Sequence, residues 1–287
     1  MPASASRADR VAGGLGATRP PLRPSVLKRR KVAEISRLLG ATTGLRCLDL
    51  GGDNGVVSYL LRQGGGQWTS ADLDQESVDS IRRLVGDPVH RLEPGRRTPF
   101  DGDAFDRVVV VDLLEHLQDD RGFVDELFRI LRPGGELIVN VPHRRDGLLR
   151  RLRLALGQTD EQHGHVRPGY TADELRARLR GRFEVVAERT YNKTPSELLD
   201  IVIRALTERI KGPRAGGSKG VVLVDEDFRR HRGLLALYAV GEPALRAFTA
   251  LDGLFVLAPG HMLIVKATSL KRAPAATSSA PEEEQRR

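Results

Sequence analysis

The chain has 287 residues, of which 40% are hydrophobic, 29% are charged and 5% are aromatic. This length allows one large domain or two small ones with a sizeable core, so a peptide-sized binding module is excluded. The composition is that of a soluble α/β protein and excludes a collagen-like chain. Cys47 is the single cysteine, so an internal disulfide is also excluded, and its apolar neighbours favour a buried side chain.

Charge is unevenly distributed along the chain. The formal net charge is +8, and residues 1–31 carry eight basic residues against one acidic residue. The rest of the chain is therefore nearly neutral, which disfavours a broad phosphate-binding face. We expect residues 1–25 to form a disordered basic arm, and contact of that arm with nucleic acid or acidic lipid stays open.

Targeting signals are not visible in the sequence. No apolar run approaches the ~18 residues that a membrane span needs, and the N-terminus lacks the hydrophobic stretch of a signal peptide. We therefore expect a cytoplasmic protein, with a peripheral position at the cytoplasmic membrane face as an open alternative.

From residue 26 to 142 the predicted elements alternate between helices and strands. A first helix, with apolar residues between 32 and 39, ends at Gly40. Strands are then predicted at 45–50, 67–72, 89–92, 107–111 and 136–141, with helices at 56–62, 75–85 and 122–131 between them. A turn is expected at 132–135. This alternation predicts a parallel sheet covered on both faces.

After residue 142 the pattern becomes less regular. A Leu/Arg-rich stretch at 148–156 fits either a helix on a membrane surface or a solvated helix that packs its leucines on the core. Further elements are a helix that starts at the Thr171/Glu174 capping box, a strand at 183–187, helical patterns at 197–210 and 234–257, and a strand at 262–267. The predicted division is an arm (1–25), a core (26–191), a helical insertion that forms an acceptor-side lid (192–260), a final core strand (261–267) and a disordered tail (268–287).

A glycine-rich turn, Asp49–Gly55, joins the first strand to the next helix. Glycines let the backbone approach a ligand closely, and open α/β sheets bind ligands at the carboxyl edge. Asp72 ends the second strand, where an acidic side chain can bind ribose hydroxyls. The pair fits a nicotinamide dinucleotide or S-adenosylmethionine. The third glycine of the dinucleotide fingerprint is missing and Asp53 would repel a pyrophosphate, which favours S-adenosylmethionine.

Four further motifs follow in order. They are Thr98–Asp101, Ala104–Val109, Leu114–Leu117 and Leu127–Gly135. Together with the glycine turn, they resemble the signature of class I S-adenosylmethionine-dependent methyltransferases with a methyltransferase type 11-like domain. The resemblance implies a Rossmann-like three-layer sandwich with a seven-stranded, mostly parallel sheet, in which the last strand runs antiparallel and follows a helical insertion.

The resemblance also implies a binding site for S-adenosylmethionine on the matching positions of this chain. These are Asp49, Gly51, Gly52, Asp53, Asn54 and Gly55 near the methionyl part, Asp72 and Leu73 at the ribose, Leu92 near the adenine, and Asp112 and Leu113 after the fourth strand. Two departures from the pattern stand out. Asp53 occupies a position where glycine is usual, and the segment before Thr98 lacks the usual acidic residue.

The acceptor side is less constrained by sequence. Methyl transfer from a sulfonium is an in-line displacement in which a base is optional. His116, His143 and His165 are candidate bases because their pKa lies near neutrality, although His116 could instead orient its loop. The candidate acceptor contacts are His163, His165, Arg167 and Tyr170, for which a structural role has equal weight. The sequence shows no third ligand for a metal beside His163 and His165, so no metal is predicted.

We therefore predict a methyltransferase that acts on a small-molecule, lipid or saccharide-linked acceptor. One alternative is a nucleic-acid or protein methyltransferase that uses the basic arm, although the nearly neutral body disfavours nucleic acid. Another is a catalytically inactive S-adenosylmethionine-binding regulatory partner. A nicotinamide-dependent dehydrogenase is the least favoured interpretation. The acceptor and the oligomeric state are not determined by the sequence.

Overall fold

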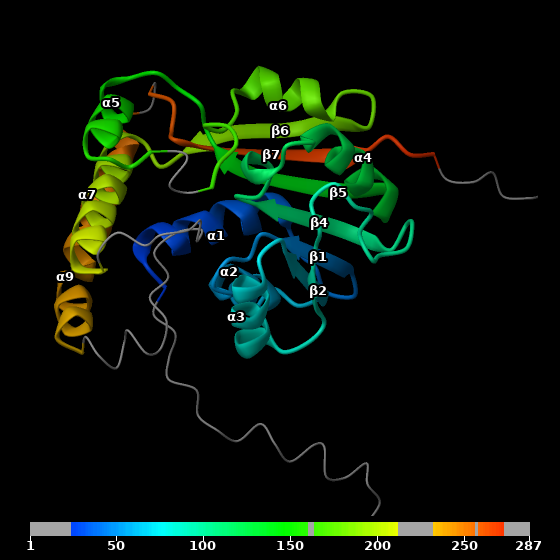
Figure 1. Cartoon of the computed structure of the whole chain (residues 1–287), viewed down its shortest axis with the longest axis horizontal. Coiled ribbons are helices and arrows are strands. Elements are labelled where there is room, and N and C mark those ends of the chain that lie inside the picture. The colour runs from blue at the N-terminus through cyan, green and yellow to red at the C-terminus, as the bar shows by residue number, and fades with distance from the viewer. Residues whose placement is uncertain (1–23, 160–163, 212–231, 256–257, 273–287) are drawn as a thin grey trace, which may run out of the picture.

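The computed structural model describes residues 24–159, 164–211, 232–255 and 258–272, and it has a single sheet at its centre (Figure 1). The strand order is β3-β2-β1-β4-β5-β7-β6. The strands are β1 (Arg46–Leu50), β2 (Gln67–Asp72), β3 (Val89–Arg91), β4 (Phe105–Val111), β5 (Leu131–Pro142), β6 (Phe183–Tyr191) and β7 (Met262–Ser269). The pairs from β3 through to β5 are parallel, and β7 is antiparallel to both β5 and β6. The predicted seven-stranded sheet with an antiparallel last strand is confirmed.

Helices cover both faces of the sheet (Figure 1). One face carries α1 (Val26–Leu39), α2 (Val56–Arg62) and α3 (Gln75–Val85), and the other carries α4 (Asp120–Ile130) and α6 (Ala172–Leu179). The short 3-10 helix η1 (Leu114–His116) follows β4 directly. This arrangement is the expected three-layer sandwich.

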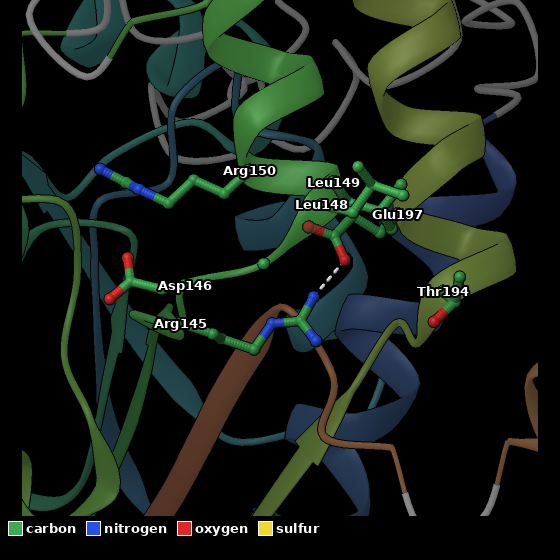
Figure 2. A pocket seen from close by; sticks show the side chains of 8 residues that line it. Arg145, Asp146, Leu148, Leu149, Arg150, Thr194 and Glu197 are labelled. Carbon is green, nitrogen blue, oxygen red and sulfur yellow. Dashed lines mark hydrogen bonds and ion pairs between the residues drawn. The ribbon is translucent and has the colours of Figure 1, made fainter.

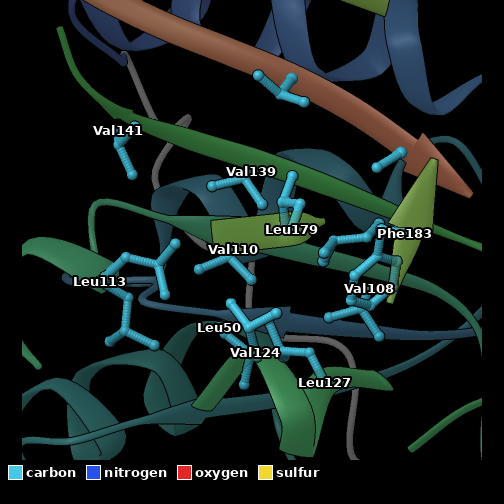
Figure 3. Close-up of a cluster of buried hydrophobic side chains, with 14 of the residues drawn as sticks. Leu50, Val108, Val110, Leu113, Val124, Leu127, Val139, Val141, Leu179 and Phe183 are labelled. Carbon is cyan, nitrogen blue, oxygen red and sulfur yellow. The ribbon is translucent and has the colours of Figure 1, made fainter. Parts of the chain in front are cut away.

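The run of valines in β4 shows why the sequence specifies this sheet. Val108 and Val110 belong to the hydrophobic cluster that includes Leu127 of α4 and Leu179 of α6 (Figure 3). Val109 and Val111 point the other way, into the cluster beneath α1 and α2. Because side chains alternate between the faces, a central parallel strand is apolar at every position.

Three predicted boundaries were wrong. Residues 132–135 do not precede the strand as a turn but lie within β5, as a bulge between the pairs Phe105↔Leu131 and Arg107↔Glu136. Strand β6 continues to Tyr191 because it pairs with β7 as far as Met262. The predicted second helix of the insertion, 234–257, ends earlier, at Ala250. A 3-10 turn that contains Gly253 follows it, and glycine does not favour continuation of an α-helix.

A group of helices lies beyond the carboxyl ends of β5 and β6 (Figure 1). It consists of α5 (Leu148–Ala155), α7 (Thr194–Lys211), α9 (Arg232–Ala250) and η3 (Leu251–Leu254), which we call the cap helices. Three of them lie between β6 and β7, where the helical insertion was predicted. Among the described residues, no helix has both the length and the apolarity to cross a membrane.

The two predicted tails lie largely outside the described residues. At the N-terminal boundary, Ser25 caps α1 by accepting a hydrogen bond from the Lys28 amide at 3.2 Å. At the other end, β7 runs to Ser269, and the Lys271 ammonium donates to the Leu131 carbonyl at 2.7 Å. The predicted tail therefore begins too early, because residues 268–271 are held against the core.

A partly buried carboxylate anchors the Thr98 motif to α4. Glu126 accepts hydrogen bonds from the Thr98 amide at 2.8 Å and from the Arg129 guanidinium at 2.6 Å. Arg129 also donates to the Phe100 carbonyl at 2.7 Å. Burial alone would raise the pKa of Glu126, but the hydrogen bonds from Arg129 and Thr98 lower it to about 2.

This shift makes the stability of the protein depend on pH. A carboxyl whose pKa is lowered by folding stabilises the native state above its ordinary pKa of 4.5, and that contribution is lost as the pH falls towards 2. Relative to Glu126→Gln, we expect the wild type to be more stable by up to about 3 kcal/mol at pH 6, and the difference to vanish near pH 2. Urea unfolding at several pH values measures this. Glu76→Gln, at an exposed position of α3, is the control; a difference that is independent of pH would contradict the assignment.

Candidate active site

The glycine turn between β1 and α2 is packed tightly against its neighbours. Gly51 has φ +84°, and a Cβ added there would lie 2.0 Å from the carbonyl oxygen of Val111 in β4. Gly55 has φ +82°, and its Cβ would lie 2.9 Å from the Cα of Ile81 in α3. Side chains at these positions would be both strained and obstructed. The glycines thus hold the turn close to the ends of β4 and α3, at the carboxyl edge of the sheet.

The Asp49 side chain lies beneath the glycine turn and points into the fold. Its carboxylate is buried and accepts hydrogen bonds from Ser58, from Ser70 at 2.8 Å and from Arg62 at 3.0 Å. Burial raises the pKa of Asp49, although Arg62 and the two hydroxyls oppose that rise. The sequence assigned Asp49 to cofactor contact. In this structure the carboxylate joins β1, α2 and β2, and its contact with the cofactor stays a prediction.

Asp72 lies at the end of β2, next to the glycine turn, as predicted for a ribose-binding residue. Its carboxylate accepts hydrogen bonds from the Leu73 amide at 2.7 Å and from the Asp53 amide at 3.3 Å. The side chain is buried in this structure. Asp72 therefore fixes the position of the turn, and its contact with a ribose stays a prediction.

Two acidic residues at this edge adopt strained backbone conformations. Asp53, after β1, has φ 51°, and Asp112, after β4, has φ 46°. Residues other than glycine rarely occupy this left-handed region, and they often do so at functional sites. Both side chains form ion pairs with α1: Lys28 lies 3.3 Å from Asp53, and Lys31 contacts Asp112. Lys28 also donates to the Asn54 side-chain oxygen at 2.6 Å.

These lysines account for the unusual Asp53. Where relatives of the motif carry glycine, this chain carries a negative charge, and α1 supplies the positive charge that compensates it. From the sequence, Lys28 and Lys31 were counted with the basic residues of the N-terminal region. Their spacing of three residues on a predicted helix places both on one side of that helix, but it does not show which acidic residues they meet.

The two ion pairs differ in their electrostatics. Burial alone would raise the pKa of Asp112. The positive charges of Lys31 and then of His165 outweigh burial, so the pKa of Asp112 lies below the ordinary value. For Asp53, burial outweighs Lys28 and the pKa is raised. Burial likewise lowers the pKa of Lys28. The Asp112 carboxylate is thus firmly ionised and lies within electrostatic reach of His165.

Helix α1 also holds the cap helices. Arg29 forms an ion pair with Glu242 of α9. Arg30 lies 2.9 Å from Asp252 of η3 and donates to the Ser196 hydroxyl of α7 at 3.1 Å. The four consecutive basic residues 28–31, which we call the basic quartet, therefore connect the glycine turn, the end of β4 and the cap helices. All four are engaged within the molecule.

The leucines predicted to contact the cofactor lie mainly in the core. Leu92 and Leu113 are buried in the cluster below α4 and α6, and Leu73 packs against it from a partly buried position. The Leu92 amide donates to the Asp72 carbonyl at 2.8 Å. The side chains of Leu92 and Leu113 are packed among apolar neighbours and support the edge, and contact of these residues with the cofactor stays a prediction.

The structure brings two of the three candidate bases together. His116 of η1 and His165 pack edge to face, with ring centroids 4.7 Å apart. The His116 Nδ1 lies 3.0 Å from the Gly164 carbonyl oxygen, and the Val166 amide donates to the Glu115 carbonyl at 2.9 Å. Residues 164–166 are thus bound along η1, directly after the end of β4.

The other candidate histidines are placed differently. The His143 Nδ1 lies 2.9 Å from the Gly260 carbonyl, and its amide donates to the His261 carbonyl at 2.8 Å. His143 therefore connects β5 to the segment that leads into β7. His163, predicted to contact an acceptor, lies outside the described residues.

Arg167 and Tyr170 hold the histidine loop in place. Arg167 lies 2.6 Å from the buried carboxylate of Asp120, and the Tyr170 hydroxyl donates to the same carboxylate at 2.8 Å. Tyr170 is buried, and this burial raises the pKa of its hydroxyl. Both residues were predicted as acceptor contacts, with a structural role as the alternative. Their polar atoms bind Asp120 and the backbone of Leu114, as the structural role requires, and acceptor contact stays a prediction.

A pocket of about 280 Å³ opens between the starts of α5 and α7 (Figure 2). Arg145 reaches across it to form an ion pair with Glu197. The lining residues are Arg145, Asp146, Gly147, Leu148, Leu149, Arg150, Thr194 and Glu197. None of the residues of α5 is buried, and Leu148 is 80% exposed. The alternative in which these leucines pack on the core is therefore wrong.

Comparison with known proteins agrees with this architecture. Residues 48–139 match the family model described as a methyltransferase domain. A demethylmenaquinone methyltransferase of Clavibacter sepedonicus is 33% identical over 107 residues, and a ubiquinone biosynthesis O-methyltransferase of Xylella fastidiosa is 30% identical over 113. Each match covers 36% of this chain and 44% of the relative, so it spans less than half of either protein.

Solved structures share the fold over a longer part of the chain. A methyltransferase of Thermotoga maritima, described as a possible histamine N-methyltransferase, superposes with a TM-score of 0.52 at 17% identity. This match covers 84% of this chain and 88% of the other. At this identity the likeness shows the fold alone.

The sheet order and the glycine turn at its carboxyl edge define a doubly wound α/β protein with a Rossmann-like ligand edge. Residues 48–139 within this fold match the methyltransferase domain model, and the solved methyltransferase structure shares the fold.

The tight packing of the glycine turn leads to a stability prediction. Gly51→Ala should destabilise the fold by roughly 3–5 kcal/mol, because the new Cβ meets the Val111 carbonyl oxygen and φ is positive. Gly86→Ala is the matched control, since Gly86 has φ +79° with nothing within 4 Å of an added Cβ, and should cost only about 1 kcal/mol. Urea denaturation measures both. Equal losses would show that backbone strain alone requires the glycine.

Proposed function

We propose that the protein is an S-adenosylmethionine-dependent methyltransferase that acts on a small-molecule or lipid-type acceptor. The observation that carries this proposal is the convergence of three groups at the carboxyl edge of one sheet. They are the glycine turn, the acidic ends of β2 and β4, and the pair His116 and His165. The glycine turn and the acidic strand ends suit the methyl donor, and the histidine pair lies where an acceptor would meet the donor.

The charges at this edge fit the donor. S-adenosylmethionine carries a positive sulfonium, a positive amino group and a negative carboxylate. Asp53 and Asp112 offer negative charge to the first two, while Lys28 and Lys31 offer positive charge to the carboxylate. Asp72 would bind the ribose. When bound, the donor supplies an activated methyl group, and the protein holds the acceptor in line with it.

The basic quartet weighs against a nucleic-acid substrate. Half of the basic residues counted in the N-terminal region belong to it, and all four form ion pairs within the molecule. Their positive charges are offset by the acidic partners, so the quartet adds little net charge with which to attract a nucleic-acid backbone. The alternative of an inactive donor-binding partner is distinguished by turnover, which it would lack with any acceptor while still binding the donor.

The surface of the cap helices supports an apolar acceptor. Leu148 lines the pocket between α5 and α7 and is four-fifths exposed, and Leu154 and Leu156, at the other end of α5, are exposed as well. The relatives from C. sepedonicus and X. fastidiosa are named for demethylmenaquinone and for ubiquinone biosynthesis. An acceptor of quinone type fits both observations. Contact of α5 with a membrane surface stays a prediction, which its exposed leucines and arginines support.

A pair of neighbouring substitutions tests the donor site. Asp72→Asn removes the carboxylate expected to accept from both ribose hydroxyls, so S-adenosylhomocysteine should bind at least tenfold more weakly, a loss of about 1.4 kcal/mol or more. Asp74→Asn is the control, because Asp74 lies two residues away as the N-cap of α3 and asparagine caps equally well. Calorimetric titration gives both dissociation constants.

The two variants also separate binding from folding. Circular dichroism and thermal unfolding should show that Asp72→Asn retains the native fold, since the asparagine oxygen can still accept the shorter bond, from the Leu73 amide, and only the 3.3 Å bond from the Asp53 amide is lost. If a folded Asp72→Asn variant binds S-adenosylhomocysteine as tightly as the wild type, the assignment of Asp72 to the ribose is wrong.

A further inference from the structure

We propose that Glu115, His116 and His165 form a binding site for a divalent transition-metal ion such as Zn²⁺. One ligand atom from each residue lies within 4.8 Å of the other two. Two of these residues are in η1, and the third is 49 residues further along the chain in the histidine loop. No metal was predicted from the sequence, because no third metal ligand lies near His163 and His165 along the chain. The fold supplies a carboxylate from a distant segment.

The hydrogen bond of His116 prepares its ring for a metal ion. A carbonyl oxygen can only accept, so the His116 Nδ1 must carry the proton that it donates to Gly164 over 3.0 Å. In the neutral ring, Nε2 then carries the free lone pair. Histidines that bind metals typically have this arrangement, in which one ring nitrogen donates to a backbone carbonyl and the other faces the ion.

The loop that carries His165 is held firmly enough to form a preorganised site. The Val166 amide is bonded to the Glu115 carbonyl at 2.9 Å. Arg167 forms an ion pair with Asp120 and also donates to the Gln118 carbonyl at 3.1 Å. Through these contacts, Arg167 holds the loop that carries His165. They fix the distance between the two histidine rings.

The burial of Glu115 favours a cation at this position. Its side chain has no exposed surface, and a buried carboxylate needs a compensating positive charge. His116 and His165 lie at ligand distance and are both only partly buried, so an ion can reach the cluster from their side.

Two imidazole nitrogens and one carboxylate oxygen select the class of ion. Mg²⁺ and Ca²⁺ prefer oxygen ligands, whereas imidazole suits zinc and similar first-row ions. Three protein ligands also leave at least one coordination position open, as in catalytic rather than structural zinc sites. The site therefore takes a Zn²⁺-like ion and can bind one further oxygen.

The position of the cluster suggests what the ion does. Glu115 and His116 follow Asp112 within four residues, and His165 lowers the pKa of Asp112, so the ion lies beside the donor edge. An acceptor hydroxyl bound to the ion would release its proton to water more easily. The resulting oxygen would form the new bond to the methyl carbon as the bond from that carbon to sulfur breaks. This role rests on the proposed function, whereas binding of the ion does not.

Metal titration of the full-length, tag-free chain tests the site. After chelator treatment and dialysis, the wild type should bind one equivalent of Zn²⁺ by calorimetry, and His165→Ala and His116→Ala should each bind at least tenfold more weakly. His90→Gln, in β3 and outside the cluster, should bind as the wild type does. Co²⁺ in place of Zn²⁺ should give a visible absorption band in the wild type that both cluster variants lose.

Two results would overturn the proposal. One is the absence of saturable Zn²⁺ binding by the wild type, and the other is equal binding by folded His165→Ala. Either would mean that the cluster of Glu115, His116 and His165 is not a metal site. Because no donor or acceptor is present, this titration is independent of the binding of S-adenosylhomocysteine, so failure of one proposal leaves the other testable.

Discussion

The candidate site depends on one set of charges, the ion pairs between the basic quartet of α1 and the acidic groups around it. Lys28 and Lys31 compensate Asp53 and Asp112, which occupy strained positions at the ends of β1 and β4. The two arginines between them hold the cap helices. Because the other side of α1 is buried on the sheet, the helix transmits the position of the core to both halves of the site.

The chemistry at the edge follows from how the sheet is built. Valines of β4 are buried on both faces, so the end of this strand is fixed, and η1 begins immediately beyond it. The glycine turn packs against the same strand end through Gly51. Arg167, Tyr170 and Asp120 then bind the histidine loop to η1. The glycine turn and the histidine loop are thereby held by rigid elements, as the proposed site for in-line transfer requires.

The local patterns predicted the fold well and the side-chain roles less well. Strand periodicity, the glycine turn and the motifs up to residue 135 specified the sheet, because they act through neighbouring residues. The sequence predicted ligand contacts for several residues whose side chains are buried or bind Asp120 in this structure. They are Asp49, Leu92, Leu113, Arg167 and Tyr170. The pairing of Lys28 with Asp53 and the approach of His165 to Glu115 depend on tertiary contacts, so sequence spacing could not show them.

The most direct test of this account is a calorimetric titration of S-adenosylhomocysteine and, separately, of NADH into the wild type and a Lys28→Ala/Lys31→Ala variant. The account predicts that the wild type binds one equivalent of S-adenosylhomocysteine and no NADH. It also predicts that the folded double variant binds the first ligand at least tenfold more weakly, because it lacks the charges that face the carboxylate. Binding of NADH, or equal affinity of both proteins for S-adenosylhomocysteine, would contradict it.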